Sequence, residues 1–188
     1  GRGRLIHHPR SSTAGDCLAQ VFHLIVILGY SLFIAITGGF ELALACDVLI
    51  ASTNARFADT HARVGILPGW GLSQKLSRLI GIYRARELSF TGNFIDAQTA
   101  CDWGLVNHVV APDALLNEAK RMAKDMASID PSMLGQYKNL INQGFEASFG
   151  EGLALEAQVS SAANGRVSAD DVEARRRTVL NRGRAQAQ

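Results

Sequence analysis

The feature that most constrains the fold is an uncharged segment near the N-terminus, because residues 17–40 contain no Asp, Glu, Lys or Arg. Preceded by arginines, such a run has the outline of a signal sequence or of a membrane span of roughly 20 residues. A fully buried parallel strand has the same sequence pattern, a continuous apolar run. Polar residues and glycine interrupt this run at Gln20, His23 and Gly29. The segment therefore favours buried sheet, with membrane insertion as the alternative.

Length, charge and cysteine content describe an ordinary globular chain. With 188 residues it can bury a sizeable core, and about one domain is expected at this length. The net charge of +2, with both signs interspersed, gives no sign of a nucleic-acid partner. Cys17, Cys46 and Cys101 are widely spaced and odd in number, which is typical of reduced, buried thiols. We therefore expect a cytoplasmic protein; an organelle matrix, or membrane association through residues 17–40, is the alternative.

Beyond residue 40, the apolar residues recur with the periods of helices and strands. The first part of the chain switches between the two, whereas helices dominate at the end. This order predicts the α/β class with a helical tail. Strands are expected at 48–52, 56–58 and 106–110, and helices at 41–46, 72–80, 82–88, 97–103 and 114–128, with two more after Pro131 and Gly150.

A glycine pair, Gly38-Gly39, leads directly into Glu41 and a helix-forming apolar run. Glycine lets a backbone come close to a ligand, and the first amide groups of a helix have no partner within it. Such amides suit a developing negative charge, and Glu41 on the first turn could exchange protons with whatever they hold. The alternative is a helix entered through a flexible glycine turn, with Glu41 as an ordinary first-turn charge.

Several further segments follow the glycine pair in a fixed order: Ile50-Ala51-Ser52, Ala55 to Ala58, Gly65 to Gly71, Leu76 to Gly81, Leu88 to Gly92 and Ala100 to Val110. Together with Gly38 to Asp47 they resemble the crotonase family, also called the enoyl-CoA hydratase/isomerase family. The resemblance implies a crotonase-like α/β fold, a spiral of ββα units with a C-terminal helical region. It implies a divergent leader and apolar segment at 1–33, a partial crotonase core at 34–112 and a helical oligomerisation region at 113–188.

The resemblance implies chemistry on an acyl-CoA thioester, with no separate cofactor because coenzyme A is part of the substrate. Family members stabilise the enolate at the thioester carbonyl with two backbone amides, an oxyanion hole. One amide matches Gly38, and Gly39 lies beside it. The other comes from an upstream loop with an Ala-x-Ala-Asp-type motif that this chain lacks, so an N-terminally truncated or divergent member is expected.

The implied activity is that of a lyase of fatty acid metabolism, the addition of water to a 2-enoyl-CoA. The alternative is a catalytically silent crotonase fragment that acts as a subunit or scaffold partner.

Hydratases of this family use two glutamates on opposite sides of a bound water. Glu41 matches the first, and His61 stands in the place of the second. Histidine can act as a base or hold a water, so Glu41 is expected as acid/base and His61 as its auxiliary. Asp59 is a second candidate acid that would point to the same side as His61 and could orient it. A loop histidine satisfied by Asp59 or a backbone carbonyl is the alternative, and His61→Glu, which restores the family's residue, is expected to raise activity.

The loop from Gly65 to Gly71 is expected beside the acyl pocket. The resemblance places Pro68 in it and brings the amide of Gly69 near the water or the acyl chain. Trp70 could line the pocket or serve only in packing. The remaining histidines show no metal-ligand spacing, so no metal is expected.

The apolar side chains of the expected helix 114–128 include a stripe of Leu115, Leu116, Met122 and Met126. In the resembled family the helical tail packs against neighbouring subunits of a trimer, often doubled into a hexamer. A stripe that a short domain leaves uncovered marks an interface. We therefore expect a homo-oligomer, trimer or hexamer; packing of the stripe inside the chain is the alternative.

Overall fold

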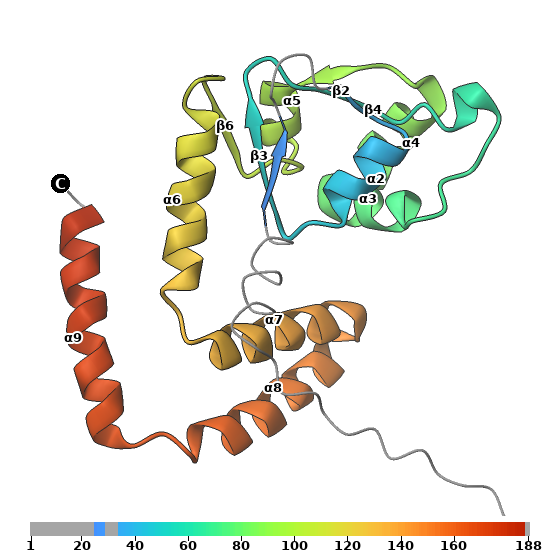
Figure 1. The fold of residues 1–188 in the computed structure, drawn as a ribbon. Helices are drawn as coiled ribbons and strands as arrows, with labels where there is room; N and C mark the ends of the chain where they lie inside the picture. Colours follow the sequence, from blue (N-terminus) through green and yellow to red (C-terminus); the bar gives the residue numbers. More distant parts are fainter. Residues whose placement is uncertain (1–24, 29–33, 187–188) are drawn as a thin grey trace, which may run out of the picture. The chain divides into compact units, whose positions relative to one another are not determined.

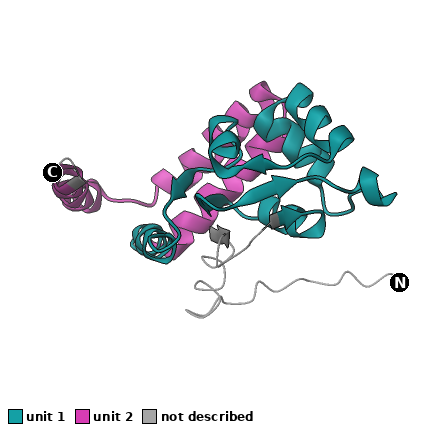
Figure 2. Ribbon diagram, turned by 90° about the horizontal axis from the view of Figure 1, so that it is seen from above, with its two compact units in different colours: residues 1–129 teal, residues 130–188 magenta. Residues whose placement is uncertain are grey.

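The computed structural model describes residues 25–28 and 34–186 (Figure 1). The chain divides into two compact units, residues 1–129 and residues 130–188 (Figure 2). All strands of the described chain lie in the first unit, and the second is helical. The three-part division expected from the sequence, with boundaries after residues 33 and 112, stays a prediction.

One sheet of the first unit is parallel. It has the order β1 (Ile25–Leu28), β3 (Val48–Ser52) and β6 (His108–Val110). The central strand is covered on both faces, since Ile50 and Ala51 are both fully buried. Parallel strands covered in this way need apolar residues at successive positions, which β3 has.

The second sheet has the order β2 (Ile34–Ile36), β4 (Arg56–Ala58) and β5 (Ile95–Asp96). β2 and β4 are parallel, and β5 runs antiparallel to β4. Ile36 pairs with Ala58 at the last residues of β2 and β4. The chain therefore leaves both strands at the same edge of the sheet, and the two segments that follow them meet there.

The described parts of the uncharged run 17–40 include the strands β1 and β2 and the start of a helix; Ala35 of β2 is buried, whereas Ile36 is 39% exposed. Its other parts, 17–24 and 29–33, lie outside the described residues. Within 25–28 and 34–186, no helix has the length and apolar character needed to cross a membrane.

Helices pack around the second sheet to form the main core. Within it, the rings of Phe40 and Phe57 lie 5.8 Å apart and tilted. The α3 helix buries Leu72, Leu76 and Ile80, which recur every four residues and so share one face. The helical segments of this unit are α2 (Gly38–Leu44), the short 3-10 helix η1 (Ala62–Val64), α3 (Leu72–Ile80), α4 (Ile82–Thr91), α5 (Ala97–Asp102) and α6 (Leu115–Ala127).

The apolar stripe of α6 packs largely inside its own unit. Leu115 and Ala119 are buried against Ile50 of β3, and Met122 packs at the border of this cluster. The stripe was expected to form an interface between subunits. For Leu115 the structure shows the alternative, packing inside the chain, because the parallel sheet needs a helix on this face and α6 supplies it; an interface between subunits stays a prediction.

Several elements of the first unit differ from the prediction, among them α4, which continues to Thr91 rather than ending at 88, and β6, which begins at His108 rather than at 106. The α2 helix begins at Gly38 rather than Glu41, because the N–H groups of Phe40 and Glu41 both bond to the carbonyl of Thr37. The two-residue strand β5 was not predicted, since a strand this short has no measurable period.

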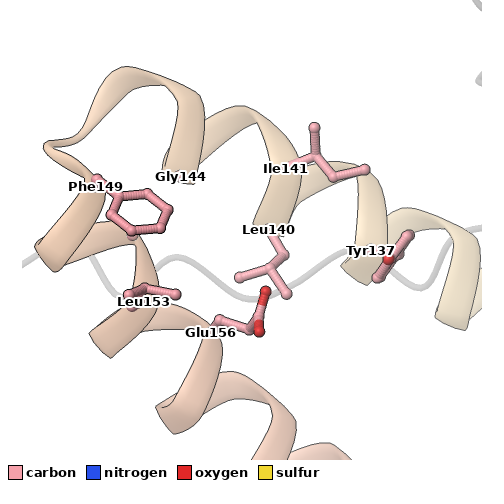
Figure 3. Close-up of a pocket in the computed structure, with 8 residues that line it drawn as sticks. Tyr137, Leu140, Ile141, Gly144, Phe149, Leu153 and Glu156 are labelled. Atoms are coloured by element: carbon pink, nitrogen blue, oxygen red, sulfur yellow. The ribbon is translucent and has the colours of Figure 1, made fainter.

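The second unit consists of α7 (Pro131–Glu146), α8 (Phe149–Asn164) and α9 (Ala169–Gln186). Helices after Pro131 and Gly150 were predicted, whereas α9 was not. Ser148 caps α8 in a reciprocal capping box with Glu151. The new helix therefore begins within a short turn after α7 ends. Figure 3 shows apolar side chains of both helices around the groove between them.

The buried face of α3 allows a matched test of the core. Leu76→Ala should lower the free energy of unfolding by about 2–5 kcal/mol, because a fully buried leucine leaves a cavity. Leu79→Ala on the same helix, where the side chain is 48% exposed, should change it far less. Urea unfolding followed by circular dichroism measures both, and equal losses would contradict the described packing.

Candidate active site

Three ionisable side chains are buried side by side in the first unit: Glu41, Asp59 and His61 are each at most 4% exposed. Glu41 lies on α2, which follows β2, and the other two follow β4 directly. Because β2 and β4 are parallel neighbours, their carboxyl ends bring these segments together, and such ends are where open α/β sheets bind ligands. Burying ionisable groups is costly unless they are paired, so a cluster of three marks a candidate functional site.

Asp59 contacts His61 at two points, the main chain and the ring. Its Oδ1 accepts the main-chain N–H of His61 at 3.2 Å and lies 2.7 Å from the ring Nδ1. An ionised carboxylate can only accept, so Nδ1 carries the hydrogen of this bond and Nε2 is left for other partners. Nε2 faces Glu41, whose Oε2 lies 3.5 Å away.

The two carboxylate oxygens of Glu41 have different surroundings. Oε1 accepts the main-chain N–H groups of Trp70 at 2.6 Å and Leu72 at 3.4 Å, whereas Oε2 faces His61. Burial by itself would raise the pKa of Glu41. The N–H groups of Trp70, Leu72 and Gly69, with a smaller effect of His61, outweigh it and hold that pKa below its ordinary value.

The backbone that enters α2 is strained. Thr37 has φ 49° and ψ −118°, the one positive φ of a non-glycine residue in the described chain, and a β-branched residue rarely adopts it. Its hydroxyl bonds the hydroxyl of Thr60 and does not cap the helix. Thr60 stands between Asp59 and His61, so this bond ties the start of α2 to the other half of the site. Thr37 does not stand out in the sequence, because threonine before a helix is an ordinary cap residue.

The 65–71 loop approaches the glycine pair. A Cβ built on Gly38 would lie 3.7 Å from a ring carbon of Trp70, so the indole stands next to that glycine. Trp70 is nevertheless 70% exposed, and its place in the acyl pocket stays a prediction. A Cβ on Gly39 would meet nothing within 4 Å. The structure thus brings Gly38, Trp70 and the Gly69 amide near Glu41, and the binding roles of Gly39, Pro68 and Gly69 stay predictions.

Among residues 25–28 and 34–186, no group of three or more His, Cys, Asp and Glu side chains is arranged to hold a metal ion.

The sequence profile of the enoyl-CoA hydratase/isomerase family matches residues 26–174. The chain belongs to this family, and the predicted crotonase fold is confirmed by its similarity to solved structures. An enoyl-CoA hydratase from Bacillus anthracis is 36% identical with a TM-score of 0.71, over 79% of this chain and 57% of that one. An enoyl-CoA hydratase from Mycobacterium tuberculosis H37Rv is 42% identical with a TM-score of 0.56, over 70% of this chain and 61% of that one.

Curated relatives carry hydratase names. The protein from Arabidopsis thaliana named "Probable enoyl-CoA hydratase 1, peroxisomal" is 49% identical over 124 residues, which are 66% of this chain and 47% of the relative. The short-chain-enoyl-CoA hydratase from Clostridium acetobutylicum is 43% identical over 124 residues, which are 66% of this chain and 48% of the relative. The chain thus spans about half the length of these two relatives.

The tie between Glu41 and the loop amides predicts an acid-sensitive contribution to stability. Because folding lowers the pKa of Glu41, its ionised form stabilises the fold above the unfolded value of about 4.3, and this contribution is lost as the pH falls through the folded value. Glu41→Gln should therefore lose less stability than wild type when the pH is lowered from 6 towards the folded pKa. Urea midpoints measured across this range test the difference; parallel curves for the two proteins would contradict it.

Proposed function

We propose that this site adds water to the double bond of a 2-enoyl-CoA thioester. The observation that carries the proposal is the buried pair of Glu41 Oε2 and His61 Nε2, 3.5 Å apart and facing each other. This distance is longer than the usual hydrogen bond of about 2.9 Å, and one water oxygen can lie about 2.8 Å from both atoms. Membership of the family and the hydratase names of the relatives support the same reaction.

The start of α2 supplies the second requirement of this reaction. Adding water to a conjugated thioester builds negative charge on the carbonyl oxygen, which a fixed amide donor stabilises. The N–H groups of Phe40 and Glu41 donate to the carbonyl of Thr37. Gly38 is the first residue of α2, and the first amides of a helix have no partner within it. The Gly38 amide is therefore our candidate donor, with the ring of Trp70 beside it to border the acyl group. Coenzyme A enters as part of the substrate.

The alternative from the sequence, a catalytically silent subunit or scaffold partner, gains no support from the comparisons. The two ideas differ in ligand binding, since a scaffold needs no acyl-CoA. Isothermal titration of the full chain with butanoyl-CoA, which cannot be hydrated, separates binding from turnover. The peroxisomal name of the Arabidopsis relative supports the organelle-matrix alternative for the compartment.

Turnover tests the proposal directly. With 2-butenoyl-CoA, whose conjugated absorbance disappears on hydration, Glu41→Gln should lower kcat by about a hundredfold or more, because it removes the charged oxygen that faces the water and His61 Nε2. Glu87→Gln is the matched control, because Glu87 is an exposed glutamate of α4. A Glu41→Gln protein that stays folded and turns over at the wild-type rate would remove Glu41 from the site.

A homo-oligomer, trimer or hexamer, remains our proposal for the assembly. Its support comes from the second unit, where large apolar side chains of α7 and α8 are more than half exposed. They are Tyr137, Ile141, Phe145, Phe149 and Leu153. Sizing with light scattering at micromolar concentration should show a trimer or larger species, and a well-folded monomer would contradict the proposal.

A further inference from the structure

Glu41 and His61 face each other in the buried cluster, but their hydrogen-bond partners differ. We propose that His61 carries the proton during the water addition, that Glu41 stays an ionised carboxylate that holds the water, and that Asp59 is the positioning residue of His61. This inference rests on the proposed function and assigns roles within it. It also replaces the expectation that Glu41 is the acid/base and His61 its auxiliary.

Glu41 is bound in a way that favours its charged form. Two main-chain N–H groups donate to Oε1, and bonds of this kind are strong when the acceptor is ionised. Its place in the first turn of α2 adds to the preference for negative charge. Taking up a proton would weaken each of these interactions. Glu41 is therefore suited to accept a hydrogen bond from water through Oε2 without taking its proton.

His61 is bound in the opposite way. Nδ1–H is committed to Asp59, so the neutral ring presents the lone pair of Nε2 towards Oε2 of Glu41. The ring cannot turn over without losing the 2.7 Å bond to Asp59. When Nε2 takes up a proton, the ring becomes a cation between two carboxylates, both of which stabilise it. The same atom can thus accept a proton and later release it.

The reaction balances with His61 as the single proton carrier. As the water oxygen bonds C3 of the enoyl group, its O–H bond breaks and the proton passes to Nε2. The electron pair of the C2=C3 bond moves to form the enolate, whose oxygen lies at the Gly38 amide. The enolate then collapses, C2 takes the proton from Nε2, and His61 is neutral again. Glu41 keeps one negative charge throughout, and no other reactant is needed.

The environment of His61 also reverses the expected effect of His61→Glu. A glutamate there would place its carboxylate beside Asp59 and Glu41, and like charges in one buried site oppose ionisation. His61→Glu should therefore lower activity. The sequence could not show this, because the approach of Glu41 to His61 depends on strand pairing.

The ring tautomer tests the arrangement without any turnover. In the full chain with ¹⁵N-labelled histidine, the neutral ring of His61 should carry its hydrogen on Nδ1 and not on Nε2. Asp59→Ala should mix the two tautomers. Asp59→Asn is the matched variant: the His61 main-chain N–H requires an oxygen at Oδ1, so the amide keeps its oxygen towards the ring and the tautomer stays. A wild-type Nε2–H tautomer, or a ¹³C shift showing protonated Glu41 at neutral pH, would overturn the inference.

Kinetics test the proton transfer itself. Asp59→Ala should lower kcat for 2-butenoyl-CoA by about tenfold or more with KM little changed, since a wrong tautomer removes the base but not the binding site. Asp59→Asn should recover part of that loss. In His61→Gly, added imidazoles should restore activity to a degree that rises with their own pKa, which a purely structural histidine would not show.

The outcomes separate the inference from the proposed function. A wild-type chain that binds butanoyl-CoA but hydrates no 2-butenoyl-CoA overturns the proposed function, and the proton-carrying role with it. In an active wild type, an unchanged kcat for Asp59→Ala overturns the inference alone. Rescue of His61→Gly that is independent of the imidazole used has the same consequence.

Discussion

The parallel pairing of β2 and β4 is the constraint on which the site depends. Their last residues, Ile36 and Ala58, lie opposite each other, so α2 and the segment 59–61 leave the sheet at one edge. The bond between the Thr37 and Thr60 hydroxyls joins the two exits immediately beyond the strands. A change of register by one residue would turn the side chains of β4 to the other face and separate the site.

Glu41 connects this edge to the rest of the core. Its carboxylate supports the start of α3, since Oε1 receives the N–H groups of Trp70 and Leu72 on either side of Gly71, the residue that precedes that helix. The neighbouring face of α3 is buried by Leu72 and Leu76 in the main core. A single charge therefore orders the loop 69–71, and the same charge faces His61. Oε1 of Glu41 thus binds the loop amides, and Oε2 of the same side chain faces His61 for the proposed chemistry.

Burial explains why this cluster stands apart from the other charges. Arg121 of α6 also forms ion pairs, with Glu118 and Asp125, but these side chains are partly or well exposed and such pairs contribute little. Asp59 and His61 are shielded from water. In the protein interior an electrostatic interaction is stronger than in water, and an unpaired polar group is costly. Each of the three groups has a partner, and a site that must stabilise a transient charge benefits from partners fixed in advance.

The sequence by itself determined the local structure and the family. The bounds of β3, β4 and α3 agree with their predicted ranges, because apolar periodicity depends only on neighbouring residues. Glu41 and His61 were also found in the sequence, from the glycine pair and from the family's motifs. The tertiary structure decided what these residues contact. The amides that hold Glu41 lie about 30 residues further along the chain, and the strained Thr37 depends on a hydroxyl 23 residues away. Contacts between segments so far apart follow from strand pairing and helix packing, which no local pattern encodes.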